Sequence, residues 1–401
     1  MRLSLIALLA ATALAAAAPA QAQKNYGPGV SDTEIRIGQT VAYSGPASAY
    51  AMVGRMQVGY FKMLNEVRGG INGRKITVLS TDDASAPPKT VEATRKLVEG
   101  DEVFAMMNSM GTATQTAVQK YLNGKKVPQV FIYASSPNLH DIKDYPWTIP
   151  FAFSFEIEGE IYGKYLTAKP DARIGVLYQN DDVGKSYLKG FMKGLGDKSR
   201  QVVKVISYEY SDPTVDSQVL QLQAAGADTF VSFSTNKAQA QALRKAAAIG
   251  WKPMYFLSYV SSSISGVLRP AGVENAVGVI SSAWFKSPND PEWDNDKAML
   301  AYLAFMKKYM PNDDPGDTTA VYTYMGTQLA ALALERCGND LTRENLMKQI
   351  TSFKDVELGL LLPGQRVNLS TTDSYPVRGG RLVRFDGTSW KPISELITVS
   401  R

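Results

Sequence analysis

The amino-acid sequence predicts an α/β protein of two similar lobes, each a doubly wound, parallel-rich sheet with helices on both faces. Short apolar runs of strand length alternate with amphipathic helical segments, and this alternation occurs twice, with a break near residues 145–155. Strands that alternate with helices form parallel sheets, because each helix returns the chain to the start of the next strand. The length of 401 residues also exceeds what one hydrophobic core usually serves.

Residues 1–22 have the features of a signal peptide. Arg2 supplies a positive charge, residues 3–18 form an apolar stretch, and Ala20-Gln21-Ala22 matches an A-x-A cleavage site before Gln23. We therefore expect the mature protein to be exported. No cysteine directly follows the expected cleavage site, so we expect no lipid anchor. No later stretch approaches the roughly 18 continuous apolar residues that a membrane helix needs.

The first run of alternating elements occupies residues 35–133. Residues 49–67 show the helical pattern well, because their apolar side chains fall on one face. Residues 88–99 open with proline, which suits the first turn of a helix. The predicted strands are 35–41, 76–81, 103–108 and 129–133, and the predicted helices are 49–67, 88–99 and 112–122.

A second run begins after the break and leads into a more helical segment. Its predicted strands are 174–178, 202–208, 229–233 and 254–257, and its predicted helices are 156–169, 184–195, 216–225 and 236–250. Beyond residue 276 we expect a strand at 277–282, helices at 293–309, 320–336 and 342–352, and short β segments such as 381–385. The repeated pattern indicates two lobes of the same type.

The stretch from residue 103 to residue 112, V-F-A-M-M-N-S-M-G-T, combines a buried strand with a helix start. It turns from apolar to small and polar at Asn108, Ser109, Met110 and Thr112. Free N–H groups of a first helical turn, short hydroxyls and the helix dipole together favour an anion. The alternative is that Ser109 or Thr112 only caps the helix.

Hydroxyl and aromatic side chains also follow other predicted strands. Ligands of open parallel sheets bind outside the carboxyl ends of the strands, where loops and helix N-termini meet. The sequence therefore predicts a small-molecule site at these ends. The segments concerned are 43–50, 82–83, 133–137, 179–182, 232–235 and 257–259.

The strand ends lack the residues that catalysis needs. His140 and Cys337 are the only histidine and cysteine in the sequence, which excludes a zinc cluster. Ser109 lacks the G-x-S-x-G elbow of a serine nucleophile. The acid pairs 82–83 and 181–182 are typical of helix caps and solvated loops. We therefore expect neither an enzyme nor a cofactor, and interpret His140 as a surface loop residue and Cys337 as a buried thiol.

The charge distribution argues against nucleic acid as a partner. The formal net charge is +5, and the Lys and Arg residues are scattered along the chain. A nucleic-acid-binding surface would need them clustered.

Four segments carry a resemblance to a known family. They are I-R-I-G-Q-T-V-A-Y-S-G-P-A-S-A-Y near the start, N-E-V-R-G-G-I-N-G-R-K-I, D-D-A-S-A-P-P-K-T before a helix, and Y-Q-N-D-D-V-G-K after a strand. Together with export and two α/β lobes, they resemble the leucine/isoleucine/valine-binding family, the type I periplasmic solute-binding proteins of ABC transporters. The resemblance extends over essentially the whole mature chain.

This resemblance implies two lobes joined by three crossover strands, which close on a small ligand in the periplasm. The ligand would pass to an inner-membrane ABC permease, and the protein would be a monomer. The crossovers would lie near residues 148–151, 280–283 and 363–367. Lobe 1 would comprise residues 23–149 plus 281–364, and lobe 2 residues 150–280 plus 365–401.

The resemblance also assigns candidate ligand contacts. Ser109 matches the serine that binds the ligand carboxylate, Ala134 offers a backbone contact, Ser136 replaces a threonine hydroxyl, and Tyr50 matches an aromatic residue that covers the ligand. Two alternatives stay open: Tyr50 packs as part of its helix start, or Ser136 only shapes the turn before Pro137. The full set of candidate ligand-binding residues is Tyr50, Asn108, Ser109, Met110, Thr112, Ala134, Ser135, Ser136, Asp182, Thr235 and Tyr259.

One departure from the family pattern bears on the ligand. Amino-acid binders of the family hold the ammonium group partly with an acid that here falls on Tyr259, and residues 253–273 contain no Asp or Glu. A family tyrosine aligns with Thr235. Burying an unpaired ammonium costs several kcal/mol. The ligand expected from this departure is a carboxylate without an α-amine, and its body would be aromatic, of the benzoate, phenylpropenoate or phenylpyruvate type.

Two other functions stay open. A branched-chain or hydrophobic amino acid would bind if Asp181 or Asp182 neutralised its amine. Alternatively, the chain would be a ligand-sensing module for a separate receptor, because closure around a ligand serves transport and signalling equally.

Overall fold

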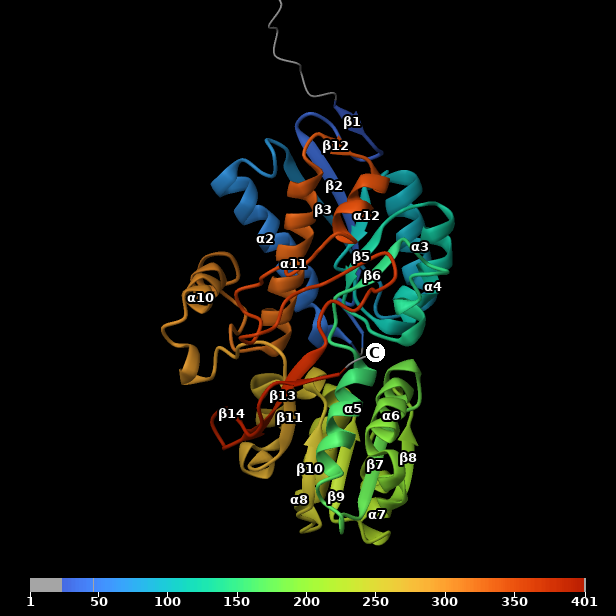
Figure 1. The fold of residues 1–401 in the computed structure, drawn as a ribbon, viewed down its shortest axis with the longest axis vertical. Coiled ribbons are helices and arrows are strands. Elements are labelled where there is room, and N and C mark those ends of the chain that lie inside the picture. The colour runs from blue at the N-terminus through green and yellow to red at the C-terminus, as the bar shows by residue number, and fades with distance from the viewer. Residues whose placement is uncertain (1–23, 46, 400–401) are drawn as a thin grey trace, which may run out of the picture.

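The computed structural model describes residues 24–45 and 47–399. It contains two α/β lobes, one above the other in Figure 1, and the chain passes between them more than once. The predicted signal peptide, residues 1–22, lies outside the described residues. Within them, no helix combines the length and the apolar character needed to cross a membrane.

The first lobe is built on a five-stranded sheet in the order β3-β2-β4-β5-β6, in which every pair is parallel. α2 packs with α11, and α3 packs with α4 (Figure 1). β1 pairs with β12 at the far end of the lobe. The strands are β1 (Asn25–Tyr26), β2 (Glu34–Val41), β3 (Lys75–Asp82), β4 (Ala105–Met107), β5 (Gln129–Ile132), β6 (Thr148–Pro150) and β12 (Asp340–Leu341), and the helices are α2 (Met52–Arg68), α3 (Pro87–Arg95), α4 (Thr112–Gly124), α10 (Lys297–Tyr309), α11 (Thr318–Cys337) and α12 (Arg343–Ile350).

The second lobe has a sheet in the order β14-β13-β11-β10-β9-β7-β8, and β15 also pairs with β13. Strands β7, β8, β9, β10 and β11 are parallel to one another, whereas β13 runs antiparallel to β11, β14 and β15. The strands are β7 (Ile174–Gln179), β8 (Val202–Tyr208), β9 (Thr229–Phe233), β10 (Met254–Leu257), β11 (Ile280–Ala283), β13 (Gly379–Phe385), β14 (Trp390–Pro392) and β15 (Ile397–Thr398), and the helices are α5 (Phe155–Leu166), α6 (Asp182–Leu195), α7 (Asp216–Ala224), α8 (Asn236–Ala248) and α9 (Arg269–Ala271).

Helices α5 and α6 lie unusually close to each other because glycines face the partner backbone. A Cβ on Gly159 would collide with the carbonyl oxygen of Tyr187, and a Cβ on Gly190 would collide with that of Glu156. This contact buries the side chains of α5 that point toward the sheet. It thereby places Glu158 in a fully buried position.

Three crossing segments join the lobes. Residues 151–154 lead from β6 to α5, residues 284–286 lead from β11 back toward α10, and residues 375–378 lead into β13. Before the third segment, Leu369 N–H still donates to Phe353 O in the first lobe, at 2.9 Å. The residue boundaries of the lobes proposed above stay predictions.

Aromatic rings fill the junction between the lobes. Trp284 is fully buried, and its ring centroid lies 5.9 Å from that of Phe151 and 6.0 Å from those of Phe153 and Tyr259. Two of the crossing segments therefore pack on each other through Trp284. Aromatic pairs of this kind stabilise the junction beyond the area that they bury.

The predicted fold class is confirmed, and the predicted elements correspond to those of the structure within a few residues. Helix 320–336, for example, is α11 (Thr318–Cys337), and Gly338 ends it as a C-cap. Cys337 is a buried free thiol, and burial raises its pKa to about 12.

Candidate ligand-binding site

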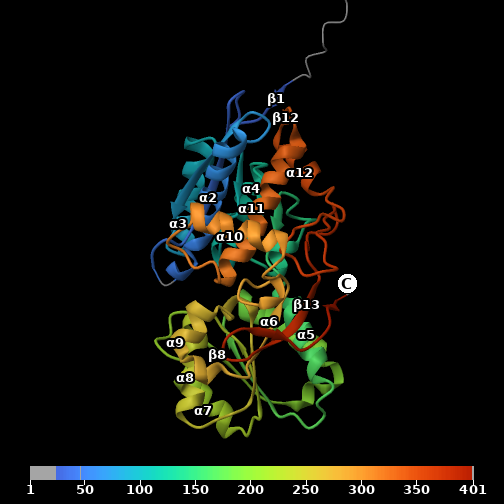
Figure 2. The same ribbon diagram turned by 90° about the vertical axis from the view of Figure 1, so that its left-hand side faces the viewer.

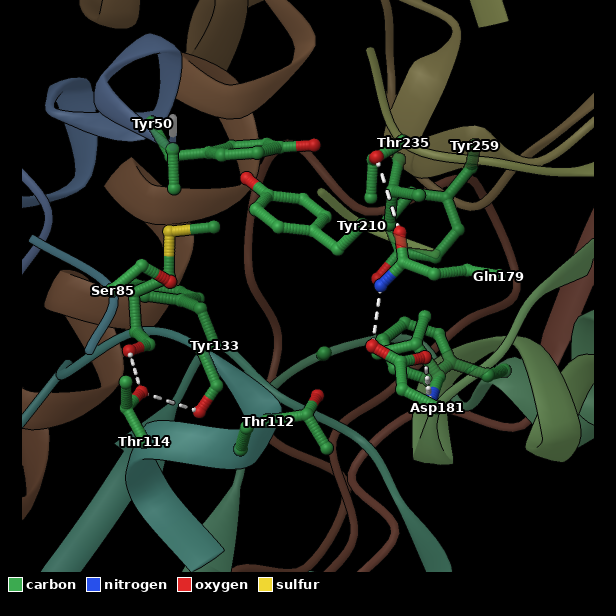
Figure 3. A pocket seen from close by; sticks show the side chains of 18 of the residues that line it. Tyr50, Ser85, Thr112, Thr114, Tyr133, Gln179, Asp181, Tyr210, Thr235 and Tyr259 are labelled. Carbon is green, nitrogen blue, oxygen red and sulfur yellow. Dashed lines mark hydrogen bonds between the residues drawn. The ribbon is translucent and has the colours of Figure 1, made fainter. Parts of the chain in front are cut away.

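A cavity of about 250 Å³ lies between the two lobes (Figure 3). Its walls come from the carboxyl ends of both sheets, where ligands of parallel sheets are expected. Tyr133 directly follows β5, Gln179 ends β7, Thr235 follows β9 and Tyr259 follows β10. Figure 2 shows how α6 approaches the first lobe beside this region.

The N-terminus of α4 forms the first-lobe end of the cavity. Gly111, Thr112, Ala113 and Thr114 all line it. Thr114 Oγ1 donates back to Met110 O at 2.8 Å, and no side chain caps the helix. Among the described residues, the N–H groups of Thr112, Ala113 and Thr114 have no acceptor. With the helix dipole, these donors provide a place for an anionic group.

Asn108 supports this helix start from behind. It adopts a φ of 56°, and its Oδ1 accepts from Gln57 Nε2 at 3.1 Å. Its Nδ2 donates to Phe131 O at 3.2 Å and to Tyr133 Oη at 3.0 Å. All three polar contacts are buried, so Asn108 fixes the turn between β4 and α4 and the position of the Tyr133 ring.

Tyrosine rings form most of the remaining walls. Tyr50, Tyr133, Tyr259 and Tyr322 are each less than a tenth exposed and line the cavity. The Tyr133 and Tyr322 ring centroids are 5.6 Å apart, and those of Tyr259 and Tyr322 are 6.4 Å apart. Burial raises the pKa of all four hydroxyls, so they stay neutral. The walls are thus apolar, with neutral hydroxyl groups at their edges.

The second-lobe end of the cavity is polar. Asp181 caps α6, because its Oδ1 accepts from Val183 N at 3.0 Å and Gly184 N at 3.2 Å, and its Oδ2 accepts from Gln179 Nε2. Gln179 Oε1 in turn accepts from Thr235 Oγ1 at 3.2 Å (Figure 3). Asp181 is the one carboxylic acid among the described lining residues, which include no Lys, Arg or His.

The structure brings five of the predicted site residues together at this cavity and leaves six outside its lining. The five are Tyr50, Met110, Thr112, Thr235 and Tyr259. The six are Asn108, Ser109, Ala134, Ser135, Ser136 and Asp182.

Of these six, the hydroxyls of Ser109 and Ser136 have different surroundings. Ser109 is fully buried, and its Oγ accepts from Thr40 N at 3.1 Å. Ser136 Oγ is buried without a partner among the described residues, and Ser136 borders a smaller cavity that Asp182 also lines. Asp181, rather than Asp182, therefore reaches the main cavity. Direct ligand contacts of Ser109 and Ser136 stay predictions.

Sequence reasoning missed two tyrosines of the cavity. Tyr210 follows β8, so the rule on strand carboxyl ends would have found it had the end of that strand been considered. Tyr322 lies in the first turns of α11, far along the chain from the other lining residues. No local sequence signal separates Tyr322 from an ordinary core tyrosine.

The interpretation of His140 as a surface loop residue was wrong. His140 is 7% exposed, its Nε2 lies 2.8 Å from Ser135 Oγ, and its Nδ1 lies 3.2 Å from Ser374 O. The Tyr375 ring stacks on the imidazole at 3.6 Å. The chain near the third crossing segment covers this loop, and that contact joins residues too distant in sequence to be predicted from the local pattern.

This geometry is that of a two-lobed protein with a cavity between its sheets in which a small solute fits. Residues 34–389 match the family model described as periplasmic binding protein, so the chain belongs to that family. The chain is therefore a periplasmic binding protein.

Comparisons with individual proteins agree with this assignment. The chain is 26% identical over 386 residues to Leu/Ile/Val-binding protein homolog 7 of Brucella suis, covering 90% of this chain and 88% of the relative. A branched chain amino acid ABC transporter from Thermus thermophilus with bound valine superimposes with a TM-score of 0.83 at 15% identity, covering 92% of this chain and 98% of that one. A solute binding protein from R. palustris in complex with benzoate superimposes with a TM-score of 0.76 at 17% identity, covering 91% of this chain and 98% of that one.

Proposed function

We propose that this protein captures a small carboxylate with an aromatic or apolar body and delivers it to an inner-membrane permease. The observation that carries the proposal is the N-terminus of α4, which presents the N–H groups of Thr112, Ala113 and Thr114 to a cavity walled by tyrosines. Hydrogen bonds to a charged group contribute roughly 1.5–3 kcal/mol each. A carboxylate at this end would be held without any basic side chain.

The size and walls of the cavity favour a ligand with a single ring. Small-molecule sites commonly enclose roughly 300–1,000 Å³, and a volume of about 250 Å³ lies just below that range. The rings of Tyr50, Tyr133, Tyr259 and Tyr322 offer both faces and edges to an aromatic partner. A structural neighbour holds benzoate, which supports the benzoate type of ligand beside the phenylpropenoate and phenylpyruvate types.

A hydrophobic amino acid is the second candidate, because Asp181 faces the cavity from the second lobe. An ammonium group there would meet a carboxylate, and a structural neighbour of this chain was solved with bound valine. However, Asp181 already accepts hydrogen bonds from Val183 N, Gly184 N and Gln179. These donors already stabilise its negative charge within the protein. We therefore rank the carboxylate without an amine first.

Isothermal titration calorimetry of the mature protein with benzoate, 4-coumarate, phenylalanine and leucine tests this order. We expect at least one of the two aromatic acids to bind about tenfold or more tightly than either amino acid, a difference of about 1.4 kcal/mol. Tight binding of leucine with no heat from the two acids would reverse the ranking.

A further inference from the structure

Glu158 of α5 is a fully buried acid that no part of the ligand-binding proposal uses. Its Oε1 lies 2.6 Å from Tyr162 Oη and accepts from Tyr259 N at 2.8 Å and from Ser282 Oγ at 2.6 Å. Its Oε2 is buried without a partner among the described residues. Three elements of the second lobe, α5, the end of β10 and β11, therefore meet at one oxygen atom.

These contacts join the cavity wall to two crossing segments. Tyr259 lines the cavity, and its hydroxyl donates to Phe153 O of the first crossing segment at 3.3 Å. Ser282 lies in β11, two residues before Trp284, which begins the second crossing segment. A change at Glu158 would thus reach both the wall that touches the ligand and the segments about which the lobes move.

No positive charge compensates Glu158. It belongs to no ion pair among the described residues. The titratable groups that face it are the hydroxyls of Tyr162 on α5, Tyr187 on α6 and Tyr259 after β10. Burial raises the pKa of Glu158 to about 7, mainly because the charged form loses its hydration.

The hydrogen-bond geometry also accommodates a proton on Glu158. Tyr162 Oη lies 2.6 Å from Glu158 Oε1 and 2.8 Å from Leu257 O, yet a tyrosine hydroxyl carries one hydrogen. Leu257 O can only accept, so it takes the tyrosine hydrogen. A proton on the Glu158 carboxyl then supplies the second hydrogen bond.

We propose that Glu158 is a positioning residue that takes up a proton when the ligand binds. The neutral carboxyl holds the Tyr259 wall against the crossing segments, and an anion in the cavity disfavours a second, uncompensated negative charge behind that wall. Because coupling between two binding events is reciprocal, the proton strengthens ligand binding as much as the ligand strengthens proton binding. The inference rests on the proposed function for the negative charge of the ligand.

The test is calorimetry with benzoate at pH 6 and pH 8.5 on the mature protein, on Glu158→Gln and on Glu160→Gln. Glutamine keeps an acceptor oxygen for Tyr259 N–H but does not titrate. Glu160 is the matched control, because it lies on the same helix and pairs with Lys164 at 2.7 Å and Lys193 at 2.8 Å. The unaltered protein and Glu160→Gln should bind benzoate roughly tenfold more weakly at pH 8.5, the effect of one unit of coupled pKa.

Glu158→Gln should bind benzoate with an affinity that changes less than about twofold between the two pH values. The tenfold change expected of the unaltered protein needs a group whose pKa shifts by about one unit on ligand binding, and glutamine has none. Calorimetry near pH 7.5 in buffers of different ionisation enthalpy should also show proton uptake by the unaltered protein and none by this variant. A pH dependence that survives in Glu158→Gln, or is absent from the unaltered protein, would overturn the inference.

A second readout separates failure of this inference from failure of the proposed function. Near-ultraviolet circular dichroism of the ligand-free protein reports the Tyr259 and Trp284 rings and should change between pH 6 and pH 8.5, but not in Glu158→Gln. If benzoate binds at neither pH while this difference holds, the proposed ligand is wrong and Glu158 still positions the wall. If the difference is absent, Glu158 does not control the wall, whatever the ligand is.

Discussion

Asp181 is the residue at which the two candidate ligands make opposite demands on the protein. An amino acid needs its negative charge for the ammonium group, whereas a carboxylate without an amine is only repelled by it. The sequence predicts that the pair 181–182 caps a helix, and Asp181 does so. That capping role does not reveal that Asp181 also lines the cavity. Capping and lining occur together here, since the helix that Asp181 caps starts at the cavity.

Asp181→Asn therefore discriminates between the candidates. Asparagine is as good an N-cap as aspartate, so α6 should keep its start. We expect benzoate to bind equally or more tightly, whereas leucine, if it binds, should lose roughly 1.5–3 kcal/mol, the contribution of a hydrogen bond to a charged group. Calorimetry measures both. Asp182→Asn is the control because Asp182 is exposed and lies outside the cavity lining, and a loss of benzoate binding in Asp181→Asn alone would count against the carboxylate.

The buried carboxyl of Glu158 should also make the stability of the fold depend on pH. Because its pKa is raised from 4.5 to about 7, the folded state keeps a proton that the unfolded state releases between these values. The free energy of unfolding should fall as pH rises through this window, by up to roughly 3 kcal/mol, and stay level above it. Urea titrations at pH 5 and pH 8 should show a smaller difference in Glu158→Gln than in Glu160→Gln. Equal differences in the two variants would mean that Glu158 does not titrate in this range.

At the scale of elements, the start of α4 is the part of the fold on which the proposed function depends most. Gly111 precedes this helix with a φ of 104° and a ψ of 130°, a conformation that residues with a side chain rarely adopt. Gly111→Ala should cost roughly 1–3 kcal/mol of stability or shift the helix start, and in either case weaken benzoate binding. Urea unfolding and calorimetry measure the two effects.

Gly124 provides a control for Gly111 at the other end of the same helix. It has open space around its Cα and no positive φ, so Gly124→Ala should leave both stability and binding nearly unchanged. Equal benzoate affinity in Gly111→Ala and Gly124→Ala would show that the ligand does not use this helix start.

Most elements could be predicted from sequence because their own residues determine them. β9, for instance, is buried along its whole length and reads as an apolar run, and α4 is amphipathic next to a polar turn. The antiparallel edge formed by β13, β14 and β15 could not be predicted in detail, since its main partner β11 lies about a hundred residues earlier. His140 was interpreted wrongly and Tyr322 was missed for the same reason, because contacts with distant segments determine the surroundings of both residues.

The candidate site was predictable in outline and not in its particulars. The strand-end rule pointed to the edge of both sheets at which the cavity lies, and five of the candidate ligand-binding residues line that cavity. It does not determine which of two neighbouring residues points inward, so Asp182 was chosen where Asp181 lines the cavity. Nor does it reveal Glu158, which lies behind the wall and accepts a hydrogen bond from Tyr259 N–H.

At the scale of the whole molecule, a cavity with walls from both lobes links ligand binding to the angle between them. Tyr50 and Tyr322 belong to the first lobe, whereas Tyr259 and Thr235 belong to the second, so a ligand that touches all four gains contacts only when the lobes are close. A ligand shifts a conformational equilibrium in proportion to its preference for one state. Under the proposed function, closure would therefore give the loaded protein a shape that a permease can distinguish from that of the empty one.

Small-angle X-ray scattering of the mature protein should therefore show a smaller radius of gyration with saturating benzoate than without ligand. The expected contraction follows from rotation of the lobes about the crossing segments, which the ring of Trp284 packs together. Trp284→Ala should reduce stability, by roughly 3–5 kcal/mol if the site does not collapse, and blunt the contraction, while Trp147→Ala in the first lobe serves as the control for losing a tryptophan. If calorimetry shows that benzoate binds while the radius of gyration stays constant, the cavity accepts its ligand without moving the lobes. Delivery would then need a signal other than closure.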